Sequence, residues 1–523
     1  MTRKLRWIGL AVLLLATASL LSVYSYGRFA QRARGAPSQA IPAAVVETPL
    51  DRSIAPMEQA HPGQAGLSLI ADNLDAFTVR ALTAREAGRS LDLQYYIWKP
   101  DLTGSLIVHE VVRAADRGVR VRLLLDDLNS HAKDSVLAAL ARHPNIEVRL
   151  FNPSRARQSY FLRGVELLLR VFSLNRRMHN KAWIADGRIA VVGGRNIGDE
   201  YFGAAEASNF LDADLAVIGE PVRETARIFD AYWNSPAAIP LDQLVDADEL
   251  SLPRLRRVGA LEYRSEDARP YVEQLRRSPS VQALLRGSRG LRWTPDAHVV
   301  SDPPQKAEGA PRRGDWLIDA ITPAFVDTRR EMFISSPYFV PGDDGVASLL
   351  RMRDRGVRIG ILTNSLAATD VAAVHGGYAP YRVPLLRGGI ELYELKARGS
   401  PSGGGSGLLG SSSSEASLHT KAFMSDGDVG FVGSVNFDPR SINLNTEMGI
   451  LFTDTQLTRD LLRLYEWKVG HENSYRLWLE NGELRWEDAG ADPPRMWTRE
   501  PDADWKRRAM AAVVRWLPVE SQL

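Results

Sequence analysis

"MHNKAWIADGRIAVVGGRN" (Met178 to Asn196) and "LHTKAFMSDGDVGFVGSVN" (Leu418 to Asn436) are two versions of one motif. Counted from their histidines, the two stretches agree at eight of eighteen positions and share the pattern H-x-K-x(4)-D-x(6)-G-[GS]-x-N. Repetition at one internal spacing is typical of a duplicated unit. We therefore expect each copy to supply half of one active site.

The sequence around the two motifs repeats as well. Residues 90–98 read as a strand, 104–118 as a helix and 119–127 as a second strand, which together make a parallel βαβ unit. Residues 331–340, 345–356 and 357–365 repeat that order. "DRGVR" recurs at a shift of 238 residues and the motif at a shift of 240, so the duplication covers both lobes.

These patterns predict an α/β protein with two duplicated lobes, each a mixed, largely parallel β-sheet flanked by helices. The expected segments are an N-terminal membrane anchor or signal peptide (1–26), a linker (27–66), a first lobe (67–254), an inter-lobe connection (255–315), a second lobe (316–475) and a C-terminal tail (476–523). Gly399 to Ser417 is rich in glycine and serine, which indicates a flexible loop before the second motif.

The amino-terminal stretch from Trp7 to Tyr26 holds twenty residues without a charge. As a helix at ~1.5 Å per residue it is about 30 Å long, the thickness of the bilayer's hydrocarbon core. A cleaved signal peptide is the alternative, but the small residues Ala16 to Ala18 lie inside the apolar run instead of after it. We favour an uncleaved anchor. The basic residues Arg3, Lys4 and Arg6 favour an amino terminus inside and the body of the protein outside the membrane, while Arg28, Arg32 and Arg34 weaken that assignment.

Composition removes several classes of site. The chain has no cysteine, which excludes disulfides, thiolate metal sites and a cysteine nucleophile. A net charge of +2 gives no overall electrostatic basis for binding nucleic acid.

The motif residues suit a phosphodiester. Alternation along a strand places His179 and Lys181 on one face, so both can reach one group of substrate atoms. The lysine can neutralise a non-bridging oxygen, and the imidazole can attack phosphorus or move a proton near neutral pH. Covalent cleavage needs one histidine to attack and another to protonate the departing alkoxide. Two lobes facing each other supply both.

These paired motifs resemble the HKD motifs of the phospholipase D superfamily, over about residues 67–475. Within that region "LQYYIW", "DRGVRVRLLLDD" and "NRRMHNKAWIADG", together with the ending "WLPVESQL", are most similar to bacterial cardiolipin synthases of the type called C. The resemblance implies that His179 is a nucleophile forming a phosphohistidine and that His419 is the general acid and later the base. The phosphate would be held by Lys181, Lys421, Asn196, Asn436 and, in the second motif only, Ser434.

The resemblance also implies carboxylates around the histidines. Asp186 and Asp426 of the motifs are expected to brace the fold. A separate downstream carboxylate orients each histidine in the family: "NTEMGI" offers Glu447 for His419, and "LDADLAV" offers Asp214 for His179, with Asp212 as the competing choice. No metal and no other cofactor is implied.

We therefore expect a phosphatidyltransferase that moves a phosphatidyl group from a donor phospholipid, phosphatidylglycerol or phosphatidylethanolamine, to phosphatidylglycerol. The expected partners are membrane phospholipids and the bilayer, not nucleic acid; the sequence defines no partner protein. The alternatives are a phospholipase D or other phosphodiesterase with water as acceptor, and a non-catalytic membrane scaffold.

Two amphipathic stretches allow two interpretations each. Tyr160 to Leu174, just before the first motif, is either a buried helix of the lobe or a helix in the lipid interface. Ala503 to Pro518 either packs against the second lobe, which we favour, or touches lipid headgroups.

Overall fold

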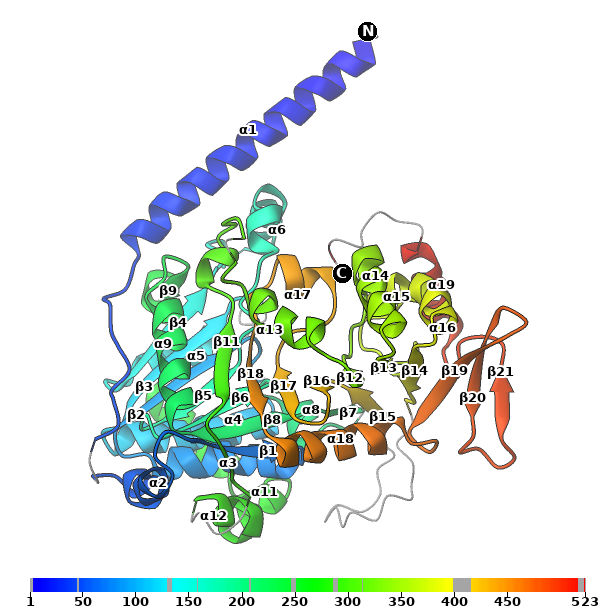
Figure 1. The fold of residues 1–523 in the computed structure, drawn as a ribbon. Coiled ribbons are helices and arrows are strands. Elements are labelled where there is room, and N and C mark those ends of the chain that lie inside the picture. Colours follow the sequence, from blue (N-terminus) through cyan, green and yellow to red (C-terminus); the bar gives the residue numbers. More distant parts are fainter. Residues whose placement is uncertain are drawn as a thin grey trace.

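The structure is a computed structural model that describes residues 3–44, 47–128, 134–157, 159–206, 208–245, 251–285, 290–312, 314–397, 415–515 and 522. One long helix, α1 (Arg3–Arg32), projects from a body built around two β-sheets (Figure 1). Most of the expected glycine-serine loop, residues 399–414, lies outside the described residues.

The first lobe is a nine-stranded sheet in the order β10-β1-β8-β6-β5-β2-β3-β4-β9. Its strands are β1 (Ala65–Ile70), β2 (Ser90–Tyr95), β3 (Arg120–Asp126), β4 (Ile146–Phe151), β5 (Ala182–Ala185), β6 (Ile189–Gly193), β8 (Asp214–Ile218), β9 (Ala238–Pro240) and β10 (Arg292–Thr294). Its helices are α3 (Asn73–Glu86), α4 (Leu102–Asp116), α5 (Asp134–Ala141), α6 (Tyr160–Leu169), α7 (Val171–Leu174), α8 (Asp199–Phe202), α9 (Glu220–Trp233), α10 (Leu252–Glu262), α11 (Arg269–Arg277) and α12 (Pro279–Leu285).

The second lobe repeats the plan in a ten-stranded sheet, in the order β11-β18-β17-β16-β12-β13-β14-β19-β20-β21. Its strands are β11 (Ala297–Ser301), β12 (Glu331–Ser335), β13 (Arg358–Asn364), β14 (Glu391–Leu395), β16 (Lys421–Ser425), β17 (Val429–Gly433), β18 (Met448–Thr453), β19 (Ser474–Glu480), β20 (Glu483–Asp488) and β21 (Arg495–Trp497). Its helices are α13 (Leu317–Val326), α14 (Gly342–Asp354), α15 (Ala372–Tyr378), α16 (Arg382–Arg387), α17 (Pro439–Asn443), α18 (Thr455–Val469) and α19 (Trp505–Val514).

Both βαβ units have the predicted parallel pairing, β2 with β3 and β12 with β13. The expectation of a largely parallel sheet was wrong. In each sheet only one run of three strands is parallel, β2-β3-β4 and β12-β13-β14, and the other pairs are antiparallel. The reason is that each motif forms a hairpin, β5-β6 or β16-β17, and a hairpin joins its strands antiparallel.

Three predicted segments need correction. The segment expected to connect the lobes supplies α11, α12 and β10 to the first lobe and β11 to the second. The segment expected to be a linker contains the end of α1, the helix α2 (Pro49–Ala60) and the start of β1. Between the two helices the chain is held on the first lobe, where Ser38 and Ala36 accept hydrogen bonds from Arg122 and Arg149. The segment expected to be a C-terminal tail supplies three strands, β19 to β21, to the second sheet.

The two lobes share a hydrophobic core. Leu215 and Val217 of β8 belong to one buried cluster with Val432 of β17 and Ile450 of β18. A two-stranded sheet also crosses the boundary, because β7 (Ser208–Leu211) of the first lobe pairs in parallel with β15 (Glu415–Leu418) of the second. The lobes therefore form one body, with the motif residues at their boundary.

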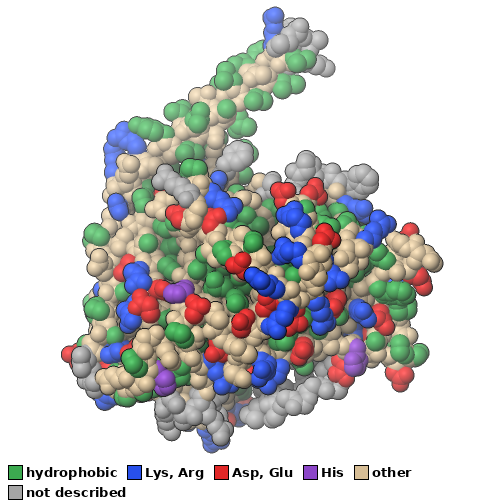
Figure 2. Space-filling model, in the orientation of Figure 1, with side chains coloured by type: hydrophobic (Ala, Val, Ile, Leu, Met, Phe, Trp, Pro, Cys, Tyr) green, Lys and Arg blue, Asp and Glu red, His purple; other side chains and the backbone are tan. Residues whose placement is uncertain are grey.

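Helix α1 is the one described helix that is long and apolar enough to cross a membrane, over Leu5–Arg32. No residue of its most apolar window is buried, and hydrophobic side chains line the helix where it projects (Figure 2). Helix α19 packs against α15 of the second lobe, where Arg507 donates to the Leu366 carbonyl.

Candidate active site

His179 is held by a carboxylate from the opposite lobe. Its Nδ1 lies 2.8 Å from Oε2 of Glu447, at the start of the second lobe's β18. Its backbone N–H donates to the carbonyl of Thr446, the residue before Glu447, at 2.9 Å. The start of the first motif therefore contacts the second lobe at Thr446 and Glu447.

His419 has the reciprocal arrangement. Its Nδ1 lies 2.6 Å from Oδ2 of Asp212, and its N–H donates to the carbonyl of Leu211 at 3.0 Å. Asp212 and Leu211 belong to the first lobe, where β7 ends against β15. Each lobe thus orients the histidine of the other.

The predicted pairings of carboxylate and histidine were therefore wrong. Glu447 holds His179 and not His419, and Asp214 holds neither histidine. Asp214 is fully buried and pairs with Arg80 at 2.9 Å and with Arg195 at 3.3 Å. Asp212, the competing choice, is an orienting residue, but for His419.

The register explains the correction. Gly193 pairs with Asp214 in the first sheet, and Gly433 pairs with Gly449 in the second. Asp212 and Glu447 each precede that paired residue by two positions, so they are equivalent. Sequence order gives no sign that either carboxylate crosses the lobe boundary.

Lys181 and Lys421 lie fully buried behind the histidines. Each ammonium donates to the carbonyl of its own motif histidine at 2.6 Å. Burial lowers the pKa of Lys181 to about 7 and that of Lys421 to about 8, against the nearby carboxylates. Each lysine is also close enough to the other lobe's carboxylate for that charge to favour its protonated form.

Both imidazoles are shifted toward the neutral form. Burial lowers the pKa of His179 to about 4, although Glu447 opposes the shift. Burial and Lys421 lower the pKa of His419, against Asp212. Burial alone would raise the pKa of Glu447, but His179, Lys181 and the Ser434 hydroxyl hold it below its usual value. The site is therefore arranged as neutral histidines beside ionised carboxylates.

The polar residues at the motif ends differ between the lobes. The amide oxygen of Asn196 accepts from the N–H of Ile97, and its nitrogen donates to Tyr201. The amide oxygen of Asn436 is buried and has no hydrogen-bond partner among the described residues. Ser434 was predicted to bind phosphate, but its hydroxyl donates to Glu447 instead, so it braces that carboxylate.

At the position equivalent to Ser434 the first lobe has Gly194. A Cβ atom there would lie 2.4 Å from an oxygen of Asp212, which leaves no room for a side chain. Ser434 therefore donates a hydrogen bond to Glu447, whereas Gly194 leaves space for Asp212.

The motif aspartates brace turns and do not face the histidines. The carboxylate of Asp186 accepts the backbone N–H groups of Gly88, Arg89 and Ser90. Asp426 accepts those of residues 329, 330 and 331. Both aspartates have a positive φ, 53° and 51°, in the turns that link the hairpin strands.

Aromatic rings surround the histidines, which sequence reasoning missed. The ring of Tyr96 meets His179 edge-on at 5.0 Å. His419 lies between Tyr201 at 5.3 Å and Phe210 at 4.8 Å. Tyr96 lies in the quoted "LQYYIW", but nothing in the sequence placed it against a histidine.

In each lobe, one residue at the end of a strand binds the backbone just before the motif histidine. Asp126 accepts the N–H of Met178 at 2.9 Å, and Asn364 accepts the N–H of Leu418 at 2.8 Å. Asp126 ends β3 and Asn364 ends β13, at the 238-residue shift of the duplication. The constant shift of the duplication could therefore have identified Asp126 and Asn364 as equivalent residues from the sequence.

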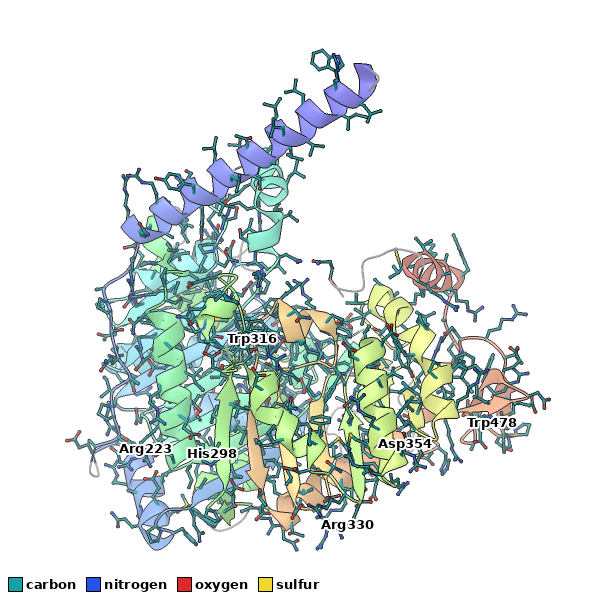
Figure 3. All side chains as sticks on the ribbon, turned by 45° about the horizontal axis from the view of Figure 1, so that its top comes forward. Arg223, His298, Trp316, Arg330, Asp354 and Trp478 are labelled. Atoms are coloured by element: carbon teal, nitrogen blue, oxygen red, sulfur yellow. The ribbon has the colours of Figure 1, made fainter. Side chains whose placement is uncertain are left out.

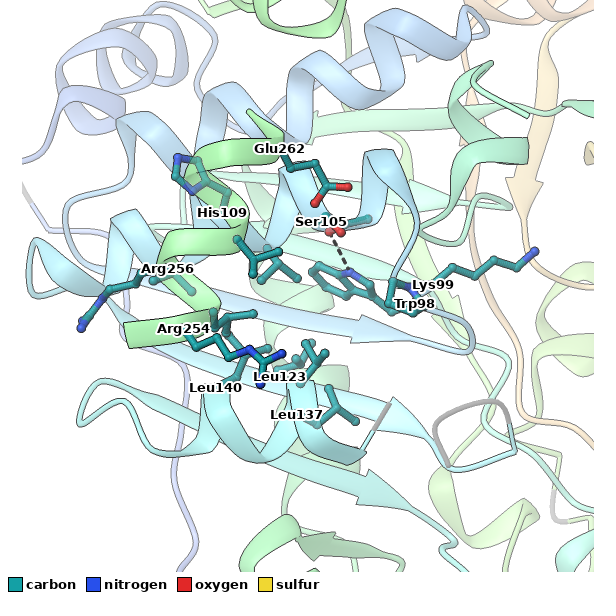
Figure 4. Close-up of a pocket in the computed structure, with 18 residues that line it drawn as sticks. Trp98, Lys99, Ser105, His109, Leu123, Leu137, Leu140, Arg254, Arg256 and Glu262 are labelled. Atoms are coloured by element: carbon teal, nitrogen blue, oxygen red, sulfur yellow. Dashed lines mark hydrogen bonds between the residues drawn. The ribbon is translucent and has the colours of Figure 1, made fainter. Parts of the chain in front are cut away.

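An apolar cavity of about 360 Å³ lies between α4, α5 and α10, with Trp98 in its wall (Figure 4). Its lining, as far as the structure describes it, includes none of the motif histidines or lysines. Among the described residues, His375, Glu394 and Glu500 are grouped closely enough to bind a metal ion. The guanidinium of Arg382 already pairs with both carboxylates of that group.

The family described as "Cardiolipin synthase, PLD-like domain" matches residues 83–233 and again residues 321–468. This chain belongs to that family. It is 41% identical over 480 residues to cardiolipin synthase C of Escherichia coli K12, covering 90% of this chain and 99% of that protein.

A cardiolipin synthase from Geobacillus kaustophilus is 27% identical, over 72% of this chain and 61% of that protein. Among solved structures, a phosphatidylserine synthase from Haemophilus influenzae Rd KW20 matches with a TM-score of 0.55 at 14% identity, covering 91% of this chain and 100% of that one. This structural likeness supports the duplicated fold. The predicted superfamily, two-lobed fold and class of phosphatidyl-transferring enzyme are confirmed.

Proposed function

We propose that this chain transfers a phosphatidyl group from a donor phospholipid to phosphatidylglycerol, giving cardiolipin, through a phosphohistidine on His179. The observation that carries the proposal is the reciprocal pairing of His179 with Glu447 and of His419 with Asp212. A carboxylate on Nδ1 keeps the proton on that nitrogen and leaves the Nε2 lone pair free. The site thus offers two oriented histidines, one for attack and one for proton transfer, as a two-step displacement requires.

In the first step Nε2 of His179 attacks phosphorus and forms a P–N bond. The P–O bond to the donor's alcohol breaks, and that oxygen takes a proton from Nε2 of His419. The two buried lysines balance the charge of the non-bridging oxygens. Burial and Lys421 hold the pKa of His419 low, and the negative charge of a bound phosphodiester would raise it.

In the second step His419 acts as the base. It takes the proton from a hydroxyl of phosphatidylglycerol, whose oxygen attacks phosphorus while the P–N bond breaks. His179 leaves as the neutral imidazole, the form that its lowered pKa of about 4 already favours. The nucleophile is assigned to His179 of the first lobe, the order that the family resemblance implies. Its partner Glu447, from the second lobe, also accepts a hydrogen bond from the Ser434 side chain, whereas Gly194 gives Asp212 no side-chain donor at the equivalent position.

The proposed donor is phosphatidylglycerol or phosphatidylethanolamine, and the proposed location is a bacterial inner membrane anchored by α1. The basic residues before the apolar run, Arg3, Lys4 and Arg6, support a periplasmic body. Protease digestion of intact spheroplasts tests this orientation: a periplasmic body is digested, and a cytoplasmic body is protected.

The activity is tested by mass spectrometry of lipids after reconstituting the full chain with phosphatidylglycerol and isotopically labelled phosphatidylethanolamine. Controls are His179→Ala and His298→Ala; the His298 side chain is 59% exposed on β11, at the surface (Figure 3). We expect cardiolipin from the unaltered chain and from His298→Ala and none from His179→Ala, and the label identifies the donor.

Other outcomes distinguish the alternatives. Phosphatidic acid without cardiolipin would make water the acceptor and the chain a phospholipase D. No lipid product from any form would favour the non-catalytic scaffold, although both histidine–carboxylate pairs are intact.

A further inference from the structure

Helix α6 presents an apolar face that nothing in the described body covers. Phe161, Leu162, Val165 and Leu168 are 76%, 57%, 38% and 62% exposed. Spacings of three and four residues place Phe161, Val165 and Leu168 on one side of the helix. We call these four residues the α6 face. The alternative of a buried lobe helix, left open by the sequence, does not fit this exposure.

A polar side of α6 is fastened to the first lobe. Glu166 accepts the Ser154 hydroxyl at 2.7 Å and the N–H of Ala156 at 2.9 Å, and it pairs with Arg170 at 2.6 Å. The polar side therefore fixes the helix, so that its apolar side points away from the lobe.

Helix α6 lies beside α1 (Figures 1 and 3). The Ser19 hydroxyl of α1 donates to the Leu169 carbonyl at 2.5 Å. Ser19 precedes Tyr26, the end of the uncharged run, by seven residues, which is about 10 Å along a helix. If α1 spans a bilayer, this contact lies at the depth where amphipathic helices insert, about 5–10 Å below the headgroups.

Exposed cations surround the same end of α1. Arg28, Arg32 and Arg34 are exposed there, and the guanidinium of Arg155 lies 4.4 Å over the ring of Phe29. Positive charge beside an apolar helix face is complementary to anionic phospholipid headgroups. Charge and continuity with α1 thus favour a lipid surface as the occupant.

The geometry points to the α6 face as a second membrane-inserted element, which together with α1 holds the catalytic site against an anionic bilayer. Helix α7 ends five residues before His179. Asn175, between them, accepts from Arg440 at 2.9 Å and 2.8 Å, and Arg440 lies on α17, shortly after Asn436. Insertion of α6 would therefore position both halves of the site at the surface where the lipid phosphates lie. The role given to this insertion rests on the proposed function, but the insertion itself can be tested without any enzymatic activity.

The test uses the absence of cysteine. Single cysteines replace Leu168 on α6 or Leu261 on α10, which are 62% and 64% exposed, in the full chain. Each carries an environment-sensitive nitrobenzoxadiazole label, and the protein is reconstituted in phosphatidylglycerol–phosphatidylethanolamine vesicles with or without brominated acyl chains. Helix α10 packs on α4 and is the matched control.

We expect bromine quenching at position 168 that is at least threefold stronger than at 261. Equal quenching at the two positions, or a blue-shifted but unquenched label at 168, as a second copy of the chain covering α6 would give, overturns the inference. This readout needs no catalysis.

A second variant tests the consequence for activity. We expect Phe161→Glu with Leu168→Glu to lower transfer on vesicles about tenfold and to leave kcat unchanged on short-chain lipids below their micellar concentration. Equal rates on vesicles for variant and parent overturn the inference. A parent inactive on both substrates would instead reject the proposed function, while the quenching result would stand.

Discussion

At the scale of single residues, the position of a carboxylate decides its role in the proposed chemistry. Asp212 and Asp214 are both buried in the first lobe, two residues apart, yet one reaches a histidine and the other two arginines. Glu447 is the counterpart of Asp212 on the other side of the site. The roles of the two aspartates should therefore separate cleanly on substitution.

Glu447→Gln should lower kcat/KM for lipid transfer by about 10²–10⁴-fold, because a neutral amide can also donate to the imidazole, which disfavours the Nδ1–H form, and it does not stabilise a charged imidazole. The melting temperature should change little. Asp214→Asn should instead destabilise the fold by about 3–5 kcal/mol, since Arg80 and Arg195 lose a buried partner. Steady-state kinetics and thermal melts check both predictions. A folded Glu447→Gln variant with parental activity would contradict the orienting role of Glu447.

The pH dependence of kcat/KM on monomeric lipids should be bell-shaped. Activity should rise as pH increases through about 4, where His179 loses its proton and becomes the nucleophile. It should fall on the alkaline side as His419, whose pKa lies below its usual value, and then Lys181, near 7, lose theirs. A rate profile from pH 3.5 to 9 measures both limbs. An acid limb at the ordinary histidine value would show that burial does not keep His179 neutral.

At the scale of elements, each motif is a β-hairpin. An aspartate in its turn binds the start of the neighbouring strand in the sheet, β2 or β12. Asp186 satisfies three N–H groups at the start of β2, and Asp426 satisfies three at the start of β12. These contacts lie within one lobe, unlike those of the orienting carboxylates. They should therefore affect stability without a direct effect on chemistry.

Asp186→Ala should lower the free energy of unfolding by about 1–3 kcal/mol, because the buried N–H of Ser90 and the more accessible N–H groups of Gly88 and Arg89 lose their acceptor. Asp426→Ala should act in the same direction. Asp354→Ala, an exposed aspartate on α14, is the matched control and should stay within about 0.5 kcal/mol of the parent. Denaturant titration measures all three. A stable but inactive Asp186→Ala would instead place that carboxylate in the chemistry.

The sequence predicted these elements well where the physics is local. Strand and helix periodicity located β2, α4 and β3 and their counterparts β12, α14 and β13 to within a few residues at most termini. It did not predict that residues 49–60 form a helix with Thr48 as its cap, or that β19 to β21 extend the second sheet. Pairing between distant strands leaves no periodic mark on either strand alone.

At the scale of the whole molecule, the site exists only because two lobes exchange carboxylates. The duplication identified His179, Lys181, His419 and Lys421 from spacing alone. It could not assign partners across the boundary, because the crossing of β7 and β15 is a tertiary contact. We therefore expect that replacing the orienting carboxylate of one lobe impairs the histidine of the other.

The most direct test of this claim is to locate the covalent intermediate. A p-nitrophenyl phosphatidyl donor, whose leaving group needs no proton, is mixed with the parent, Asp212→Asn or Glu447→Gln, quenched at alkaline pH and mapped by peptide mass spectrometry. We predict that Asp212→Asn accumulates a phosphatidyl adduct on His179, because its second-step base His419 is impaired, whereas Glu447→Gln forms little. An adduct on His419, or equal adduct on His179 in both variants, would contradict the cross-lobe account.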